Sequence, residues 1–226
     1  MTAHSSGQLV IISGPSGAGK STVVRELLAR CPLPLELSVS ATTRPPRPGE
    51  QDHVAYHFLS HAEFARRRGA GEFLECKEVF GRGHWYGTLR SEVITGLAAG
   101  KWIILEIDVE GALAVLEQYP EAITIFLHPG SEAELESRLR HRGTESEESL
   151  QLRLEVARRE LTYRPSYRHE VINDRVERAV QEICRILLSH QAAGLPVAAS
   201  DRSAGQQNPV ENNTFLHDRR SRGGVR

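Results

Sequence analysis

A glycine-rich segment near the N-terminus, Gly14-Pro15-Ser16-Gly17-Ala18-Gly19-Lys20-Ser21, restricts what this chain can fold into more than any other feature. It follows an apolar run at residues 9–12 and opens into a helical pattern that continues to about Arg30. A strand, a glycine turn and a helix in this order are typical of a phosphate-binding P-loop. The glycines let backbone N–H groups turn toward a polyphosphate, and the helix N-terminus adds partial positive charge. The segment predicts a nucleoside triphosphate site.

Two side chains of this segment carry the expected chemistry. Lys20 is long enough to reach the β- and γ-phosphates, and the Ser21 hydroxyl can ligate Mg²⁺. The alternative, a glycine-rich turn without a ligand, does not explain why a strand and a helix flank the motif in the required order. The expected ATP-binding residues are Gly14, Pro15, Ser16, Gly17, Ala18, Gly19, Lys20, Ser21 and Thr22.

Composition excludes several function classes. A formal net charge of −1 provides no overall field for nucleic acid or for a membrane surface. The apolar runs are strand-sized, and residues 1–7 lack the basic and apolar regions of a secretory signal. The cysteines Cys31, Cys76 and Cys184 lack metal-ligand spacing. We interpret them as three unrelated reduced thiols, and we expect a cytoplasmic protein that binds neither nucleic acid nor membrane.

Apolar, strand-sized runs alternate with helical patterns from the first strand to about His190. Such alternation favours an α/β fold, a P-loop NTPase-type parallel sheet flanked by helices on both faces. The later runs lie at residues 35–40, 102–108, 122–127 and 169–173.

Two polar insertions interrupt this alternation. Residues 38–90 are expected to form short strands, turns and one helix, which begins at Ser60 with Glu63 completing a capping box. Residues 141–150 include a charged loop, with a helix cap expected at Thr144. Outside the alternating region, residues 1–7 are expected to be flexible. Residues 191–226 are expected to be disordered, although their basic end leaves a weak polyanion-binding arm as an alternative.

The first insertion contains candidate phosphate ligands. Arg44 and Arg47 lie three residues apart on a proline-rich loop. Guanidinium groups suit bidentate phosphate binding, and prolines reduce the entropy lost when a loop is held in place. Tyr56 and Tyr86 can add phenolic donors. A solvated basic loop with half-buried packing tyrosines remains the alternative reading of these residues alone.

Several ordered motifs in this chain resemble the guanylate kinase family over about residues 8–190. The resemblance implies a core (8–37 and 91–190), a GMP-binding insertion (38–90) and a lid (141–150). It also implies a reaction in which ATP phosphorylates GMP, and dGMP as well, to give ADP and the nucleoside diphosphate. Mg²⁺ is the implied cofactor. The matching pieces are residues 12–21, 38–50, 71–75, 85–88, 105–108 with Gly111, and 138–145.

The resemblance also implies roles for individual residues of the insertion. The GMP phosphate would be held by Arg44, Arg47, Tyr56 and Tyr86. A second group of residues, which includes Glu75, would bind the guanine base. The chemistry of Glu75 supports this, because guanine presents N1–H and a 2-amino group that one carboxylate can accept, whereas adenine presents a bare acceptor. The full GMP-binding set is Ser40, Arg44, Arg47, Glu50, Tyr56, Glu75, Tyr86, Thr88 and Asp108, with Ser40, Glu75 and Thr88 as the guanine readers.

Two carboxylates, Glu106 and Asp108, follow the apolar run that starts at Trp102. Residues two apart on a strand point to one face, and the carboxyl ends of strands in open α/β sheets are where ligands bind. Either carboxylate could hold Mg²⁺ through water, with Asp108 the expected candidate, or orient the GMP loop. Ordinary strand-end carboxylates remain the alternative.

The second insertion carries arginines that the resemblance places over ATP. Charge in phosphoryl transfer spreads over the transferred oxygens, so arginines brought in by closure can stabilise it. No general base is needed, because the attacking GMP phosphate is already an anion. Asn173 is expected to contact adenine through its backbone. The expected catalytic residues are Lys20, Arg44, Arg138, Arg142 and Arg153.

One departure from the family pattern lies between Glu75 and Tyr86, where the chain is slightly longer around Gly81 and Gly83. We expect the turn to absorb the extra length. Two other functions stay open: a binding module that kept the fold but lost catalysis, and a P-loop kinase for another phosphorylated acceptor. The intact Lys20 and Arg44 argue against the first, and Glu75 argues against the second. A monomer and a homo-oligomer are both compatible with the sequence.

Overall fold

The computed structural model describes residues 7–79, 83–141 and 147–194. Four expectations therefore lie wholly or partly outside the described residues. They concern the N-terminal segment, the Thr144 helix cap, the side chain of Arg142 and the tail that follows residue 194.

A five-stranded, wholly parallel sheet forms the centre of the molecule, in the order β2-β7-β1-β8-β9. The strand that precedes the glycine-rich segment, β1 (Gln8–Ser13), is buried at every position. Its place in the middle of the sheet explains its unbroken apolar run, because strands covered on both faces carry no polar alternation. The predicted α/β class is confirmed. The other strands are β2 (Leu35–Leu37), β7 (Trp102–Glu106), β8 (Ile123–His128) and β9 (His169–Ile172).

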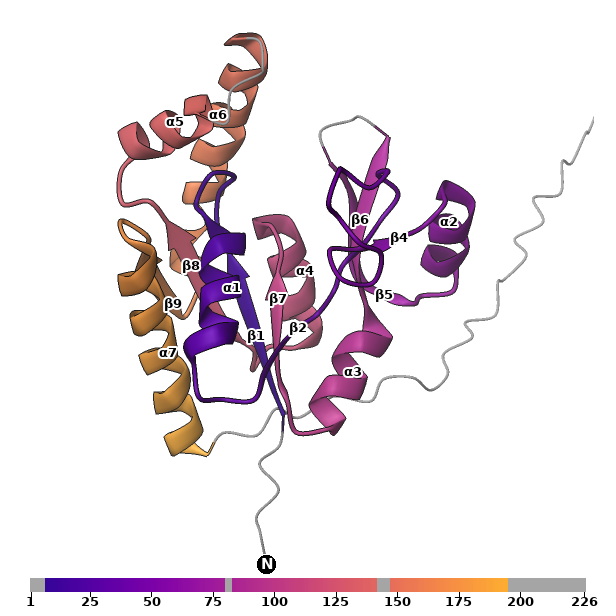
Figure 1. The fold of residues 1–226 in the computed structure, drawn as a ribbon, viewed down its shortest axis with the longest axis horizontal. Helices are drawn as coiled ribbons and strands as arrows, with labels where there is room; N and C mark the ends of the chain where they lie inside the picture. Colours follow the sequence, from indigo (N-terminus) through magenta and orange to yellow (C-terminus); the bar gives the residue numbers. More distant parts are fainter. Residues whose placement is uncertain (1–6, 80–82, 142–146, 195–226) are drawn as a thin grey trace, which may run out of the picture.

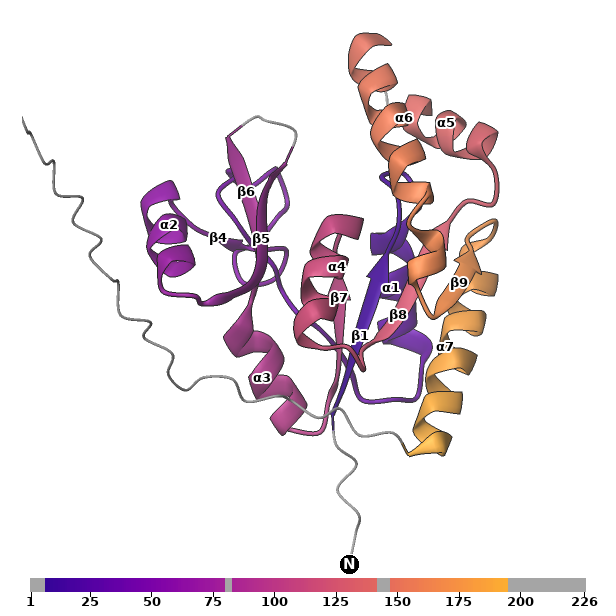
Figure 2. The same cartoon turned by 180° about the vertical axis from the view of Figure 1, so that it is seen from behind.

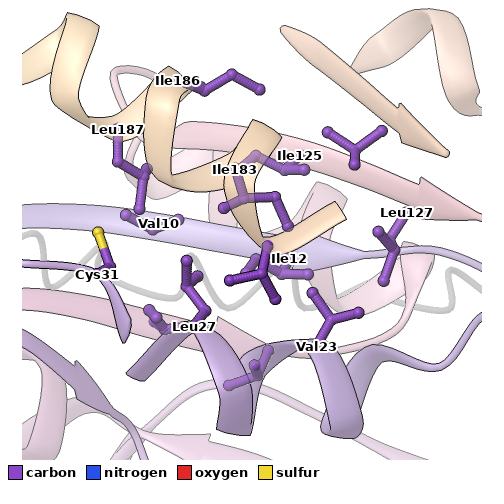
Figure 3. Close-up of a cluster of buried hydrophobic side chains, with 14 of the residues drawn as sticks. Val10, Ile12, Val23, Leu27, Cys31, Ile125, Leu127, Ile183, Ile186 and Leu187 are labelled. Atoms are coloured by element: carbon purple, nitrogen blue, oxygen red, sulfur yellow. The ribbon is translucent and has the colours of Figure 1, made fainter. Parts of the chain in front are cut away.

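Helices cover both faces of this sheet, as Figures 1 and 2 show from opposite sides. On one face, Val10 and Ile12 of β1 pack in a cluster with α1 (Lys20–Arg30) and α7 (Val176–Ala193), drawn in Figure 3. On the other face, Leu9 and Ile11 pack with α3 (Arg90–Ala98) and α4 (Val109–Gln118). Because successive strand residues point to opposite faces, a single apolar run fills two cores.

The contact between α1 and α7 brings two cysteines together. The Sγ atoms of Cys31 and Cys184 lie 2.9 Å apart although 153 positions separate them in the sequence. Burial, the largest cause, together with the neighbouring Cys31, raises the pKa of Cys184 to about 11. The prediction of three unrelated thiols is therefore wrong for this pair, because the spacing of cysteines in the sequence does not show which helices pack against each other. Cys76 lies elsewhere, against the core of the first insertion.

The first insertion builds a separate four-stranded sheet in the order β4-β3-β6-β5. Phe64 of the single helix α2 (His61–Gly69) packs on this sheet against Phe73 and Leu89. The predicted helix cap is confirmed in part: the Ser60 hydroxyl accepts the Glu63 amide at 3.1 Å, but the Glu63 carboxylate pairs with arginines of its own helix. The strands are β3 (Ala41–Thr42), β4 (His57–Phe58), β5 (Phe73–Val79) and β6 (His84–Leu89).

A helical pair, α5 (Glu132–His141) and α6 (Glu147–Leu161), rises beyond the carboxyl ends of the central strands (Figure 1). The pair has its own apolar cluster, in which Leu135 and Leu139 meet Leu150 and Leu154. A short 3₁₀ turn, η1 (Arg164–Ser166), then leads into β9. Among the described residues, none of the helices is both long and apolar enough to cross a bilayer.

Candidate active site

The glycine-rich segment forms the turn between β1 and α1 that the sequence predicts. Gly14 has φ 142°, and a Cβ atom there would collide with the carbonyl oxygen of Leu127 on the neighbouring strand. Gly19, the N-cap of α1, has φ 85°, and a Cβ atom there would lie 2.6 Å from the side-chain nitrogen of Asn173. Left-handed backbone and close packing together require glycine at both positions.

The two functional side chains of this loop are already oriented. The Lys20 ammonium donates to the carbonyl oxygens of Gly14 at 2.6 Å and of Pro15 at 3.2 Å, so the side chain folds back over the loop. The Ser21 hydroxyl donates to the Glu106 carboxylate at 2.5 Å. Ser21 begins the helix and Glu106 ends β7, so the parallel pairing of β1 with β7 is what brings them together.

Asn173 supports the P-loop from the end of β9. Its side-chain amide donates to the carbonyl oxygen of Ala18 at 2.8 Å, and its own carbonyl accepts an N–H of Arg138 at 2.8 Å. Asn173 and Ala18 are both almost fully buried. The structure thus gives Asn173 a side-chain role that the sequence did not predict, while its expected contact with adenine stays a prediction.

Removal of the Asn173 amide is expected to weaken ATP binding selectively. In the Asn173→Asp variant the buried carbonyl of Ala18 loses its donor, which costs about 1–3 kcal/mol and loosens the loop. We expect KM for ATP to rise by about 5- to 150-fold, the same free energy expressed as affinity. Steady-state kinetics with each substrate varied in turn would measure this, with Asn173→Ala as a variant that introduces no charge. A rise confined to KM for GMP would contradict the assignment.

The two carboxylates at the end of β7 differ from the prediction. The strand ends at Glu106, and Asp108 is the N-cap of α4, where its Oδ1 accepts the amide of Gly111 at 2.9 Å. The other oxygen pairs with the ammonium of Lys77 at 2.6 Å. The prediction that both residues lie on the strand is therefore wrong for Asp108, because this favoured capping residue begins α4. Both carboxylates nevertheless line the same cavities.

The residues predicted to hold the GMP phosphate form one cluster. The guanidinium of Arg44 is buried and makes two 2.9 Å hydrogen bonds to the carboxylate of Glu50. Its Nε donates to the Tyr86 hydroxyl at 3.2 Å, and its carbon lies 5.4 Å from the ring centre of Tyr56. The Arg47 amide donates to Glu50 at 2.7 Å. The Arg44 hydrogen bonds are the first cause that lowers the pKa of Glu50, so this carboxylate stays ionised and fixes the arginine.

The predicted guanine reader, Glu75, lies on β5 opposite Thr88 of β6. The Thr88 hydroxyl donates to its Oε1 at 2.7 Å, so this buried threonine acts on Glu75. Burial is the main reason that the pKa of Glu75 rises to about 7; the Thr88 bond opposes the rise, and the negative charge of Asp108 adds to it. The register also pairs Tyr86 with Lys77, so the extra residues of the hairpin do not displace the predicted side chains.

Two cavities adjoin in this region. One of 570 Å³ lies over the P-loop and reaches α6, where Arg153 is part of its wall. The other, of 730 Å³, contains Ser40, Arg47 and Glu75. The two cavities therefore share part of their wall. The residues common to both are Ser21, Tyr56, Lys77, Glu106 and Asp108.

The three arginines that were predicted to belong to the lid do not all lie in the same place. Arg138 on α5 lies beside the P-loop, with one of its nitrogens 3.9 Å from where a Cβ of Gly19 would be. Its Nε is paired with Glu134 at 2.8 Å. Arg153 on α6 lines the cavity over the P-loop, and Arg142 lies outside the described residues.

Sequence reasoning assigned no role to two residues of this site. Lys77 lines both cavities, and its only sequence signal is rarity, because the chain has three lysines among its 28 basic residues. Gly111 lies beside Glu75: a Cβ atom there would be 3.1 Å from the Oε2 of Glu75. The motif that contains Gly111 is part of the resemblance, but only the packing of α4 against β5 explains the need for a small residue.

The known proteins to which this chain is similar include guanylate kinases. A family model described as guanylate kinase matches residues 6–190. A guanylate kinase of Rhodopirellula baltica is 62% identical over 191 residues, which cover 84% of this chain and 91% of that protein. A guanylate kinase of Caldanaerobacter subterraneus subsp. tengcongensis is 44% identical with the same coverage. The crystal structure of a guanylate kinase from Anaplasma phagocytophilum has a TM-score of 0.68 at 32% identity, covering 83% of this chain and 87% of the other.

Proposed function

The chain belongs to the guanylate kinase family, and from that premise we propose how its two adjoining cavities carry out phosphoryl transfer. The enzyme transfers the γ-phosphate of ATP to GMP and yields ADP and GDP. The observation that carries our proposal is the shared wall of the cavities, which joins a P-loop on one side to the half-buried carboxylate of Glu75 on the other. ATP would bind over the P-loop and GMP would bind beside Glu75.

On the ATP side, the loop amides and the helix N-terminus would surround the phosphates. Lys20 now donates to two loop carbonyls, and we propose that it exchanges at least one of them for phosphate oxygens when ATP binds. Arg138 and Arg153 would add positive charge from α5 and α6, where it offsets the charge of the transferring phosphoryl group.

A magnesium ion fits the junction of the two cavities. Ser21 and Glu106 present oxygen atoms 2.5 Å apart beside the P-loop, and oxygen is the ligand that Mg²⁺ prefers. In the described parts of the chain no cluster of three or more histidine, cysteine or acidic residues forms a closed metal site, which suits an ion that keeps waters and phosphates as ligands. When bound, the ion would neutralise phosphate charge. We propose Ser21 as its ligand and Glu106 as its nearest carboxylate, since both oxygens of Asp108 are engaged.

On the GMP side, the phosphate would lie between Arg47, Tyr56 and Tyr86, with Arg44 behind them. Glu50 occupies two N–H groups of Arg44, so we propose that it positions this arginine and pre-organises the clamp before GMP arrives. The phosphate of bound GMP then supplies the nucleophilic oxygen, and no protein base is needed.

The guanine ring would be read by Glu75, with Ser40 lining the same cavity. We propose that Thr88 fixes one carboxylate oxygen and that Gly111 leaves space for the other, so both can accept from N1–H and the 2-amino group. A site built to satisfy such hydrogen bonds rejects a base that lacks them by about 10⁴-fold or more.

We further propose that residues 38–90 act as a GMP-binding domain and residues 141–150 as part of a lid. The separate sheet of the insertion and the separate apolar cluster of α5 and α6 support this division, because each unit can move without disrupting the central core. A cytoplasmic location stays a prediction, as do the absence of nucleic acid and membrane partners and the oligomeric state.

The acceptor range is tested by a coupled ADP-release assay with GMP, dGMP, AMP and UMP. We expect GMP and dGMP to be phosphorylated and AMP to react about 10⁴-fold less efficiently in kcat/KM. The ribose 2′-hydroxyl is not required by any contact proposed above. Turnover with AMP or UMP comparable to GMP would overturn the guanine-reading proposal, and no turnover with any acceptor would indicate a binding module.

A further inference from the structure

The ammonium group of Lys77 lies where the two substrate cavities meet. Among the described residues, five line both cavities, and Lys77 is the cation of that set. We propose that Lys77 is a positioning residue for the guanine site, which fixes the reader strand β5 to the N-terminus of α4 through Asp108. This inference rests on the proposed role of Glu75 as the guanine reader.

The use of lysine at this position is itself informative. The chain contains 25 arginines and only three lysines: Lys20, Lys77 and Lys101. An ammonium group is a compact point charge, whereas a guanidinium is a broad planar fork. Lys77 lies near the carboxylates of Asp108 and Glu110 on the wall that the two cavities share, where a compact charge can approach both.

The contacts of Lys77 connect separate structural units. Its Nζ lies 2.6 Å from Asp108 Oδ2 and 3.2 Å from Glu110 Oε2, and both acids belong to the first turn of α4 or its cap. Lys77 and Asp108 are each about one-third exposed, at 30% and 31%. The pair therefore joins a strand of the inserted sheet to a helix of the central core at a place that is only partly solvated.

This link acts on Glu75 through the strand. Glu75 and Lys77 are two positions apart on β5 with regular pairing to Thr88 and Tyr86, so both side chains point to the same face. That face meets α4, where Gly111 leaves just enough room for the Glu75 carboxylate. Without the Lys77 ion pair, β5 can shift relative to α4, and Glu75 loses its fixed distance from the guanine edge.

The same lysine also favours the ionised reader. The charges of two groups act on the Glu75 carboxyl in opposite directions: that of Asp108 raises its pKa and that of Lys77 lowers it. On the ATP side the network continues, since Glu110 also accepts from Arg159 of α6 at 2.7 Å. Arg159 is 68% exposed, so we assign it little of the effect.

The test compares acceptors that differ only at the 2-amino group. Inosine monophosphate lacks this group, so the ratio of kcat/KM for GMP to that for inosine monophosphate reports how well Glu75 is placed. In Lys77→Met we expect this ratio to fall about 5- to 10-fold, which corresponds to about 1.0–1.4 kcal/mol. KM for GMP should rise by a similar factor, while kcat with GMP and KM for ATP stay within about threefold.

Two further variants separate positioning from general damage. Lys77→Arg keeps the charge but replaces the compact ammonium with a broader fork, so it should recover a part of the loss and not all of it. Lys101→Met removes a lysine beside the opposite, amino-terminal end of β7 and should leave every parameter unchanged. Thermal melting of each variant checks that the fold is intact.

The outcomes distinguish this inference from the proposal beneath it. If Glu75→Gln collapses the acceptor ratio but Lys77→Met does not, the positioning role of Lys77 is overturned and the guanine reader stands. If Glu75→Gln leaves the ratio unchanged, the reader assignment fails instead. If Lys77→Met lowers kcat equally with both acceptors, or if Lys77→Arg recovers nothing, the ion pair does not position Glu75 and the inference is overturned.

Discussion

Replacement of Lys20 by methionine is expected to lower kcat by about 10²–10³-fold or more, because a well-placed charged donor to the transferring phosphate is lost. The side chain sits at the start of α1, and its ammonium reaches back to the carbonyl oxygens of Gly14 and Pro15. Methionine keeps the length and apolar stem but has no donor. Single-turnover kinetics with saturating ATP and GMP would measure the effect on the chemical step.

The Lys20 prediction has two controls. Lys20→Arg keeps the charge but replaces a point charge with a broad fork, so we expect it to restore little activity. Thermal melting should still show a folded protein, because the loop glycines and the Asn173 contact hold the loop backbone in addition to the two contacts of the ammonium. A folded Lys20→Met enzyme with near-normal kcat would remove the assignment of the P-loop as the transfer site.

The second large effect is expected for Glu75→Gln. The amide has one acceptor and turns a donor toward the N1–H and 2-amino group of guanine. Loss of one hydrogen bond and of the carboxylate charge, together with the opposed donors, should lower kcat/KM for GMP by about 10²–10⁴-fold, with little change in KM for ATP. The measurement is steady-state kinetics with GMP and with AMP, and the difference between their kcat/KM values should become smaller.

The pH dependence of GMP binding gives a second readout for Glu75. The pKa of this carboxyl is raised to about 7, mainly by burial, so it is largely protonated in the free enzyme below pH 7. Guanine requires the ionised form, so the affinity for GMP should fall by up to about tenfold per pH unit below pH 7. In Glu75→Gln this part of the pH dependence should disappear. The pH dependence that remains then comes from ionisation of the GMP phosphate itself. Identical pH profiles for both proteins would contradict the raised pKa.

The raised pKa of Glu75 also predicts that its ionised carboxylate lowers the free energy of unfolding. A folded carboxyl whose pKa lies above its ordinary value of 4.5 contributes stability below that value and loses it as pH rises through 7. The full shift corresponds to at most about 3 kcal/mol. At pH 8, Glu75→Gln is therefore expected to melt up to about 6–12 °C higher than the unchanged protein, with no difference near pH 4.5. A lower melting temperature at pH 8 would show that the ionised carboxylate is not destabilising.

Much of the fold could be predicted from local patterns. Strand-length apolar runs, the glycine turn and the cap at Ser60 depend on neighbouring residues; the strands and the turn are confirmed, and the cap is confirmed in part because Glu63 does not complete the capping box. Arg44 could be named as a phosphate ligand because it lies on a proline-rich loop, whereas the role of Glu75 as guanine reader came from the resemblance of its motif to guanylate kinases. Tyr86 and Glu75 line one cavity and Arg44 contacts Tyr86, which agrees with that prediction, although their roles stay proposals.

The sequence by itself therefore determined the order of elements, the P-loop and the chemistry available on each side of the site. Only the tertiary structure decided which distant groups meet: Ser21 with Glu106, Asn173 with the P-loop carbonyl, Cys31 with Cys184, and Lys77 with Asp108. The physical reason is that periodicity and capping act over a few residues, whereas these pairs depend on how strands align in a sheet and how helices pack across it. Asp108 shows the boundary: its type predicted a carboxylate near the site, but packing made it the cap of α4 and the partner of Lys77.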